Sequence, residues 1–145
     1  MSRVLVVDDE EGVRLALKRR IERESYAVET AASAAEAIER MRKGEQPFDV
    51  VVTDMSMEQA DSGLEVLREA VAHDVFSEVI VLTAYGNVTN AVESMRRGAF
   101  DYIEKNAPSV DIFEVLVAKV KLALERRRAS IGTVRRLDAV IQRLG

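Results

Sequence analysis

Apolar and polar positions change period along the chain, and these changes predict its elements. Short runs of valine, isoleucine and leucine that end on polar residues are typical of buried strands. Between these runs, apolar residues recur at spacings of three and four, which is typical of helices. We therefore predict five strands separated by helices, with the strands at 3–7, 26–31, 50–54, 79–82 and 99–104.

Several residues mark where the predicted helices begin and end. Ser33 is followed three positions later by Glu36, which predicts a capping box at the start of the second helix. Gly44 and Gly98 are in positions typical of residues just past a helix C-terminus. For the fifth helix we expect Ser109 as the N-cap, with Asp111 in the first turn.

The order of the predicted elements indicates an α/β fold. A strand followed by a helix, repeated five times, predicts a doubly wound parallel sheet with helices on both faces. If the strand order is 2-1-3-4-5, as in flavodoxin-like folds, the first and third strands flank the point where the order reverses. Ligands bind such sheets outside the carboxyl ends of the strands at that point.

Composition limits the class of protein. The chain has 145 residues, of which 48 % are hydrophobic and 32 % charged, as expected for one soluble globular domain. It has no cysteine, which excludes disulfides and thiolate metal sites. No apolar run approaches the ~20 residues of a membrane helix, and no signal peptide opens the chain. We expect a cytoplasmic protein without membrane contact.

Charge is unevenly distributed along the chain. Residues 1–106 contain 13 Lys/Arg and 21 Asp/Glu, whereas residues 107–145 contain 8 and 4. The acidic body argues against non-specific binding to nucleic acid, and the tail is only weakly basic. We therefore expect no direct nucleic-acid binding by this chain.

Side chains that could bind a metal ion or take part in a reaction lie at the ends of four of the five strands. Asp8 and Asp9 follow the first, Asp54 ends the third, Thr83 follows the fourth and Lys105 follows the fifth. In a parallel sheet these carboxyl ends share one edge, so the topology brings the side chains together. Three neighbouring carboxylates repel one another and favour a bound cation. All-oxygen ligands without a calcium-loop pattern favour Mg²⁺.

An aspartate carboxylate at such a place has a second possible role. It can act as a nucleophile that forms an aspartyl-phosphate, which makes Asp54 a candidate acceptor. Mg²⁺ and the Lys105 ammonium would neutralise the phosphoryl oxygens, and the Thr83 hydroxyl could contact them. The residues thus predict a phosphoryl-accepting site.

This set of residues resembles the response-regulator receiver domain, the CheY-like family. The resemblance rests on the pair Asp8-Asp9, on Asp54, on Thr83-Ala84 and on Lys105, and it covers residues 3 to about 125. The stretches 83–86 and 98–105 are especially similar to receivers of nitrogen-regulatory-type transcriptional regulators.

The resemblance implies roles for the acidic residues. Asp54 would accept a phosphoryl group from a sensor histidine kinase or a phosphotransfer protein. Asp9, Asp54 and the backbone carbonyl of Ser56 would bind Mg²⁺ directly, and Asp8 would act largely through water. The chain would be a signalling switch of a two-component system and no enzyme beyond its own phosphorylation and dephosphorylation.

The resemblance also implies a set of switch residues. Lys105 would contact the phosphoryl group, Thr83 would move toward it, and Tyr102 would turn inward with Thr83. Such a change would alter the surface near Tyr102 and the fifth helix, and a phosphorylation-linked homodimer is a reasonable hypothesis for that surface.

The chain departs from the family pattern at two turns. Asn106 follows Lys105 where the family usually has proline. After Asp54, Glu58 stands where the family has proline, and Gly63 lies one residue further along than the family's glycine. We expect a longer and less constrained loop after Asp54, which would alter the lifetime of the phosphoryl group or the fit of the kinase.

Three other functions are compatible with parts of this pattern. A receiver-like interaction module that is never phosphorylated is the main alternative. A phosphatase of the dehalogenase-like class would carry its nucleophile in an Asp-x-Asp pattern after the first strand, where this chain has Asp8-Asp9-Glu10. A flavodoxin relative would need a phosphate-binding loop after that strand, and none is present.

The C-terminal segment differs from the rest of the chain in its pattern of apolar residues. We assign residues 1–128 to the receiver domain and 129–145 to a helical tail or linker. Val134, Leu137, Ile141 and Leu144 form a stripe at spacings of 3, 4 and 3, after a predicted break or bend at 131–133. This tail would pack on its own domain, bind a partner or second copy, or begin a linker to an output domain.

Overall fold

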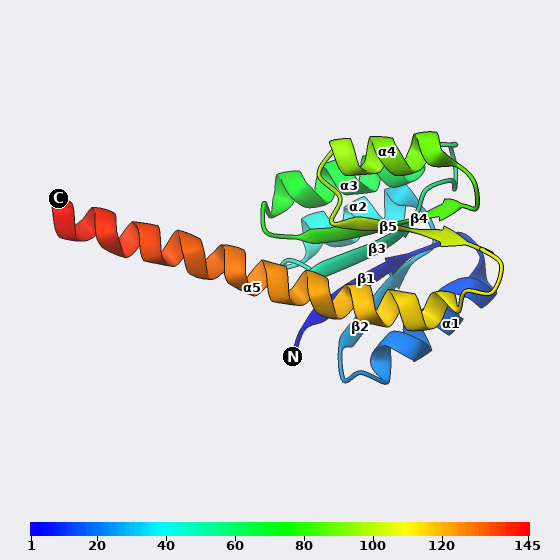
Figure 1. Ribbon diagram of the computed structural model, residues 1–145, viewed down its shortest axis with the longest axis horizontal. Helices are drawn as coiled ribbons and strands as arrows, with labels where there is room; N and C mark the ends of the chain where they lie inside the picture. Colours follow the sequence, from blue (N-terminus) through cyan, green and yellow to red (C-terminus); the bar gives the residue numbers. More distant parts are fainter.

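A five-stranded parallel sheet forms the centre of the molecule in the computed structural model, which describes residues 1–145 (Figure 1). The strand order β2-β1-β3-β4-β5 confirms the predicted topology, and β2 lies at an edge. The strands are β1 (Arg3–Val7), β2 (Ala27–Ala31), β3 (Val50–Asp54), β4 (Glu78–Ala84) and β5 (Asp101–Lys105).

Five helices cover the two faces of this sheet. In Figure 1, α1 and α5 lie on one face, and α2, α3 and α4 lie on the other. The arrangement is the doubly wound α/β fold expected from the sequence. The helices are α1 (Glu11–Glu22), α2 (Ala34–Lys43), α3 (Ser62–His73), α4 (Val88–Arg96) and α5 (Ile112–Leu144).

The core consists of two apolar layers, one on each face of the sheet. Successive residues of a strand point to opposite faces, so β1 contributes Val4 and Val6 to the α1/α5 layer and Leu5 and Val7 to the α2/α3 layer. All four side chains are fully buried. Burial of one such side chain contributes roughly 1.5–3 kcal/mol, which explains why the central strands are continuous apolar runs.

The capping box predicted for α2 is present in a modified form. The Ser33 hydroxyl accepts a hydrogen bond from the Glu36 N–H at 3.0 Å. The Glu36 carboxylate accepts from the N–H of Ala32 at 2.9 Å, one residue before the cap. The helix therefore begins where the sequence predicted.

The start of α5 corrects a prediction. Asp111 is the N-cap, and its side chain accepts hydrogen bonds from the N–H groups of Phe113 and Glu114. Ser109 has a φ of 59°, a left-handed conformation, whereas an N-cap residue normally has extended backbone. The expectation that Ser109 caps this helix is therefore wrong.

The last helix is much longer than the others. It runs for 33 residues without interruption through Gly132, so of the break or bend predicted at 131–133 the break does not occur. Figure 1 shows it leaving the body of the molecule at the amino end of the sheet. Every residue from 133 to 145 is exposed. No helix of the structure, this one included, has both the length and the apolar character needed to span a membrane.

Candidate functional site

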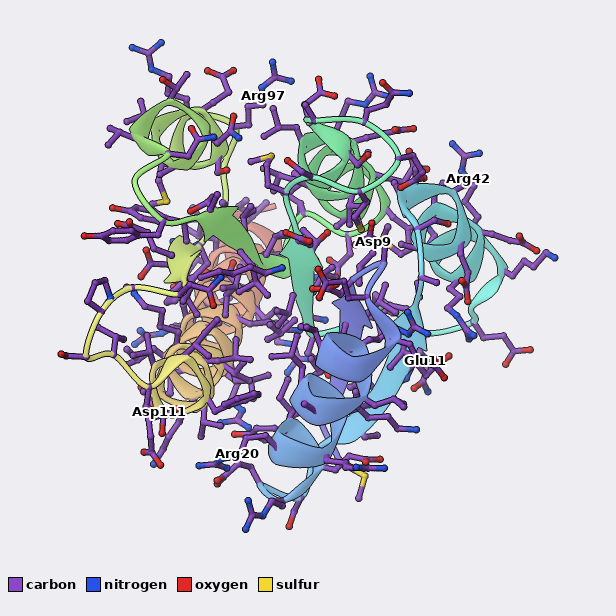
Figure 2. The ribbon with its side chains drawn as sticks, turned by 90° about the vertical axis from the view of Figure 1, so that its right-hand side faces the viewer. Asp9, Glu11, Arg20, Arg42, Arg97 and Asp111 are labelled. Atoms are coloured by element: carbon purple, nitrogen blue, oxygen red, sulfur yellow. The ribbon has the colours of Figure 1, made fainter.

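The candidate site lies at the carboxyl edge of the sheet, where β1, β3, β4 and β5 end. Figure 2 views this edge and shows Asp9 near its middle, beside the start of α1 at Glu11. The strand register aligns Asp54 with Leu82 and thus sets it beside the end of β4. The parallel topology brings Asp8, Asp9, Asp54 and Lys105 to one place.

Three carboxylates meet at this edge. Oxygen atoms of Asp8, Asp9 and Asp54 all lie within 4.8 Å of one another, which is close enough to share one metal ion. Asp8 is fully buried and accepts a hydrogen bond from the Glu10 N–H at 2.9 Å. Asp9 is exposed and Asp54 is partly buried, so the cluster opens to solvent on one side.

Lys105 supplies the only positive charge in ion-pair contact with these acids. Its Nζ atom lies 3.0 Å from Asp54 Oδ2 and 3.2 Å from Asp8 Oδ2. One ammonium group therefore faces three carboxylates. The site has an excess of negative charge that a cation would neutralise.

Burial and neighbouring charges shift the ionisation of both central groups. Burial raises the pKa of the Asp54 carboxyl, the charges of Asp8 and Asp9 add to this, and Lys105 offsets it only in part. Burial alone would lower the pKa of Lys105, but the hydrogen bonds and charges of Asp54 and Asp8 outweigh it and raise that pKa. The lysine therefore stays charged at neutral pH.

Thr83 follows Leu82, which the register aligns with Asp54, and carries an unused hydrogen-bonding group at the same edge of the sheet. Its side chain is fully buried at the end of β4, and its hydroxyl is the one buried side-chain polar atom in the structure without a hydrogen-bond partner. A buried hydroxyl without a partner costs free energy, so such a group in a native structure calls for an explanation. An incoming anionic oxygen would provide the missing partner.

The loop after Asp54 is held close to the end of β3 by Gly63. A Cβ atom at this position would lie 2.6 Å from the carbonyl oxygen of Asp54 and 2.8 Å from the Cα atom of Met55. The Gly63 N–H also donates to the carbonyl oxygen of Met55 at 2.7 Å. A glycine is therefore required here for α3 to begin against the acceptor strand, a need the loop length alone did not reveal.

Glu58 corrects the prediction that this loop is less constrained. Its carboxylate accepts hydrogen bonds from the backbone N–H groups of Ala34 and Ala35 at the start of α2. The side chain therefore ties the loop where the family has proline. No local sequence pattern indicates this tie, because the two N–H groups lie 24 and 23 residues earlier in the chain.

The turn after Lys105 also differs from the family pattern. Asn106 has a φ of 57°, and the chain contains no cis peptide bond. Asparagine tolerates the left-handed conformation better than most residues, so it makes this turn without proline.

Tyr102 lies on β5 and is not among the residues that contact the carboxylate cluster. It is half-buried and lines a hollow of about 400 Å³ with residues of α4 that include Val88 and Met95. Nearby, the Glu104 carboxylate accepts a hydrogen bond from the Gly86 N–H at 2.9 Å, which joins β5 to the loop before α4.

Comparison with known proteins identifies the family. Residues 4–117 match the response regulator receiver domain. The chain belongs to this family. The acidic pocket and the fold are those of a two-component receiver, and no enzyme family is indicated. Family membership sets aside the dehalogenase-like phosphatase and the flavodoxin relative.

Curated relatives are regulatory proteins longer than this chain. The chain is 34 % identical over 116 residues to the acid tolerance regulatory protein ActR of Rhizobium meliloti, covering 80 % of this chain and 58 % of ActR. It is 35 % identical over 127 residues to the C4-dicarboxylate transport transcriptional regulatory protein DctD of Pseudomonas aeruginosa, covering 88 % of this chain and 26 % of DctD. The similarity to receivers of transcriptional regulators is confirmed.

Solved structures agree with the fold. A response regulator receiver domain protein from Clostridium thermocellum superposes with a TM-score of 0.78 at 30 % identity, covering 89 % of this chain and 98 % of that one. The response regulator TrrA of Thermotoga maritima, solved with Mg²⁺ and BeF, has a TM-score of 0.70 at 33 % identity and covers 86 % of this chain and 100 % of its own.

Proposed function

We propose that this receiver is switched by phosphorylation of Asp54, with a sensor histidine kinase or a phosphotransfer protein as donor. The observation that carries the proposal is the convergence of a partly buried carboxylate, a paired lysine and an unpartnered buried hydroxyl at one sheet edge. The Asp54 oxygen would attack phosphorus as the bond from phosphorus to the donor nitrogen breaks, leaving an aspartyl-phosphate and a free histidine.

Mg²⁺ is the cation that fits the donor set. Asp9, Asp54 and the carbonyl of Ser56 would hold it directly, and Asp8 would act through water. The carboxylate cluster offers only oxygen ligands and one side open to solvent, which suits an ion that keeps several waters. When bound, Mg²⁺ would neutralise charge on the phosphoryl oxygens.

Lys105 and Thr83 would contact the phosphoryl group and respond to its presence. Lys105 already contacts Asp54 and would stay beside the phosphoryl oxygens as a fixed positive charge. The Thr83 hydroxyl would gain its missing partner by donating to one of those oxygens. Since Thr83 is the second-last residue of β4, its movement would shift the loop before α4 and the hollow lined by Tyr102.

A second hollow adjoins the site and suits a donor protein. It measures about 380 Å³ and lies between α1 and the start of α5. Lys105 borders it beside the apolar side chains of Val13, Ile112 and Phe113. A helix of the donor could bury apolar surface here and bring its phosphohistidine to Asp54.

This proposal gives different roles to the receiver domain and to the C-terminal tail. Residues 1–128 would receive the phosphoryl group, and residues 129–145 would carry the change outward as a tail or linker. The surface of α4, β5 and α5 near Tyr102 would form the phosphorylation-linked homodimer. Light scattering with and without BeF₃⁻ and Mg²⁺ tests this last point, since equal molecular masses would contradict it.

The experiment for the central proposal is the intact mass of the protein after incubation with acetyl phosphate and Mg²⁺. We expect one added phosphoryl group, absent from Asp54→Asn and from a sample with chelator. Label on Asp54→Asn would contradict the acceptor assignment. A wild-type protein that neither gains mass nor binds Mg²⁺ would favour the interaction module that is never phosphorylated.

A further inference from the structure

We propose that Glu58 is a positioning residue that anchors the phosphorylation loop, residues 55–61, to the N-terminus of α2. The inference rests on the proposed function, because it concerns the loop that carries the Ser56 carbonyl toward Mg²⁺. Glu58 would act through this loop and would touch neither the metal ion nor the phosphoryl group.

The contact itself is specific and long-range. Two oxygens of the Glu58 carboxylate accept from the N–H groups of Ala34 at 3.0 Å and Ala35 at 3.2 Å. These are first-turn N–H groups of α2, which have no partner within the helix. A carboxylate at a helix N-terminus also interacts favourably with the helix dipole. Ser33 serves the next such group, the N–H of Glu36, so one local and one distant residue share the cap.

The helix to which Glu58 binds is a fixed support. Ala34, Ala37 and Met41 bury one face of α2 in the core layer beside α3. Its N-terminus is therefore held by the packing of the whole helix. A loop tied to it takes its position from the body of the domain.

No other hydrogen bond gives residues 56–61 such support. The Ser56 hydroxyl donates to the carbonyl oxygen of Ala60 at 2.8 Å, a contact within the loop. The Gln59 N–H donates to the Ser62 hydroxyl at 2.8 Å, a contact with the adjoining helix α3. Only Glu58 joins this segment to a part of the chain that precedes β3.

The consequence for the site follows from chain connectivity. Glu58 is two residues from Ser56, so release of Glu58 leaves the segment that carries the Ser56 carbonyl held by the buried Met55 and by the packing of Met57 on the core, without its hydrogen bonds to α2. Groups that orient metal ligands typically change metal affinity by about 10–100-fold when they are removed. We expect the lower end of this range, about tenfold, because one ligand of the set is affected.

The test compares Glu58→Ala with Ser33→Ala. Both variants remove a cap from the same turn of α2, but only the first releases the loop. Calorimetric titration with MgCl₂ should show about tenfold weaker binding for Glu58→Ala and wild-type binding for Ser33→Ala. Glu58→Gln keeps one side-chain oxygen as an acceptor and should lie between wild type and Glu58→Ala.

A second readout separates positioning from general damage to the fold. The rate of phosphoryl uptake from acetyl phosphate should require about ten times more Mg²⁺ in Glu58→Ala and should reach the wild-type maximum when Mg²⁺ is saturating. Urea denaturation should show similar losses of stability in Glu58→Ala and Ser33→Ala.

Two results would overturn the inference and differ from failure of the proposed function. Equal Mg²⁺ affinity in wild type and Glu58→Ala would contradict it, as would equal weakening in Glu58→Ala and Ser33→Ala. A wild-type chain that takes up no phosphoryl group would instead contradict the proposed function, and this inference with it.

Discussion

The two edges of the sheet use the same residue types in opposite ways. At the amino edge, Asp49 and Asp74 each contact Arg127 at 2.8 Å, and Asp49 also accepts from the backbone N–H of Arg3 at 2.7 Å. Glu78 there pairs with Arg126. At the carboxyl edge three aspartates lie together, and the one ion-pair partner there, Lys105, contacts only Asp8 and Asp54.

This contrast separates structural acids from functional ones. The carboxylates of the amino edge hold α5 against the domain, and each of them has an arginine partner. The carboxyl edge keeps an excess of negative charge and the unpartnered Thr83 hydroxyl, at a cost to stability that a cation and a phosphoryl group would remove. The number of ion-pair partners available to the carboxylates, more than the residue type, distinguishes the two edges.

The largest expected effect is on the rate of phosphoryl uptake. Lys105→Met removes the positive charge beside Asp54 and should slow uptake from acetyl phosphate by about 10²-fold, the usual loss for one stabilising group in a reaction centre. Arg127→Met, at the other edge, should label at the wild-type rate. Equal rates in wild type and Lys105→Met, followed by intact mass over time, would contradict the role of Lys105.

The next effect concerns Mg²⁺ and the free energy of unfolding. A ligand that binds only the folded chain adds about 2.7 kcal/mol when its concentration is 100 times its Kd. We expect this gain in wild type and its loss in Asp9→Asn, measured by urea denaturation with and without MgCl₂. Asp74→Asn should retain the full gain, since its carboxylate belongs to the amino edge. A gain of equal size in Asp9→Asn would place the ion elsewhere.

A somewhat smaller effect is expected at the amino edge itself. Arg127→Met leaves the partly buried Asp74 carboxylate without its ion-pair partner and should lower the free energy of unfolding by about 2 kcal/mol. Arg128 is exposed and makes no ion pair, so Arg128→Met is the matched control with a change below about 0.5 kcal/mol. The difference in free energy of unfolding between wild type and Arg127→Met should be the same with and without MgCl₂. If Mg²⁺ restored the stability of Arg127→Met, the two edges would not be independent.

The smallest effect is a dependence of stability on pH without Mg²⁺. The pKa of Asp54 is raised in the folded chain by burial and by Asp8 and Asp9, so its proton is held more tightly when folded. This contribution to stability is complete below the unfolded pKa and is lost as pH rises through the folded pKa. Asp54→Asn escapes the loss, so it should be more stable than wild type at neutral pH. The difference in free energy of unfolding between Asp54→Asn and wild type should become smaller as the pH is lowered toward about 4, near the ordinary pKa of aspartate. A difference that stays constant with pH would show that ionisation of Asp54 is not its cause.

Much of the site could be predicted because it depends on strand ends. The topology alone brings Asp8, Asp9, Asp54 and Lys105 to one edge, since each lies at the end of a strand or within two residues of it. No local pattern shows that Glu58 caps a helix 24 residues earlier, since that contact depends on tertiary placement.

Other details depended on backbone conformation and close approach. Asp111 rather than Ser109 caps α5, because the left-handed backbone of Ser109 excludes it from that role. Both residues are good caps by type, so the sequence did not distinguish them. The need for Gly63 follows from a contact with the Asp54 carbonyl that is set by how α3 docks on β3.

The central claim is that Asp54 is the phosphoryl acceptor, and the most direct measurement locates the phosphoryl group on the chain. Borohydride reduces an aspartyl-phosphate to homoserine, and peptide mass spectrometry then shows which residue was modified. After incubation with acetyl phosphate and Mg²⁺, we predict homoserine at position 54 and unmodified aspartate at positions 8 and 9. Homoserine at position 8 or 9, or none in a protein that has gained phosphoryl mass, would contradict the assignment.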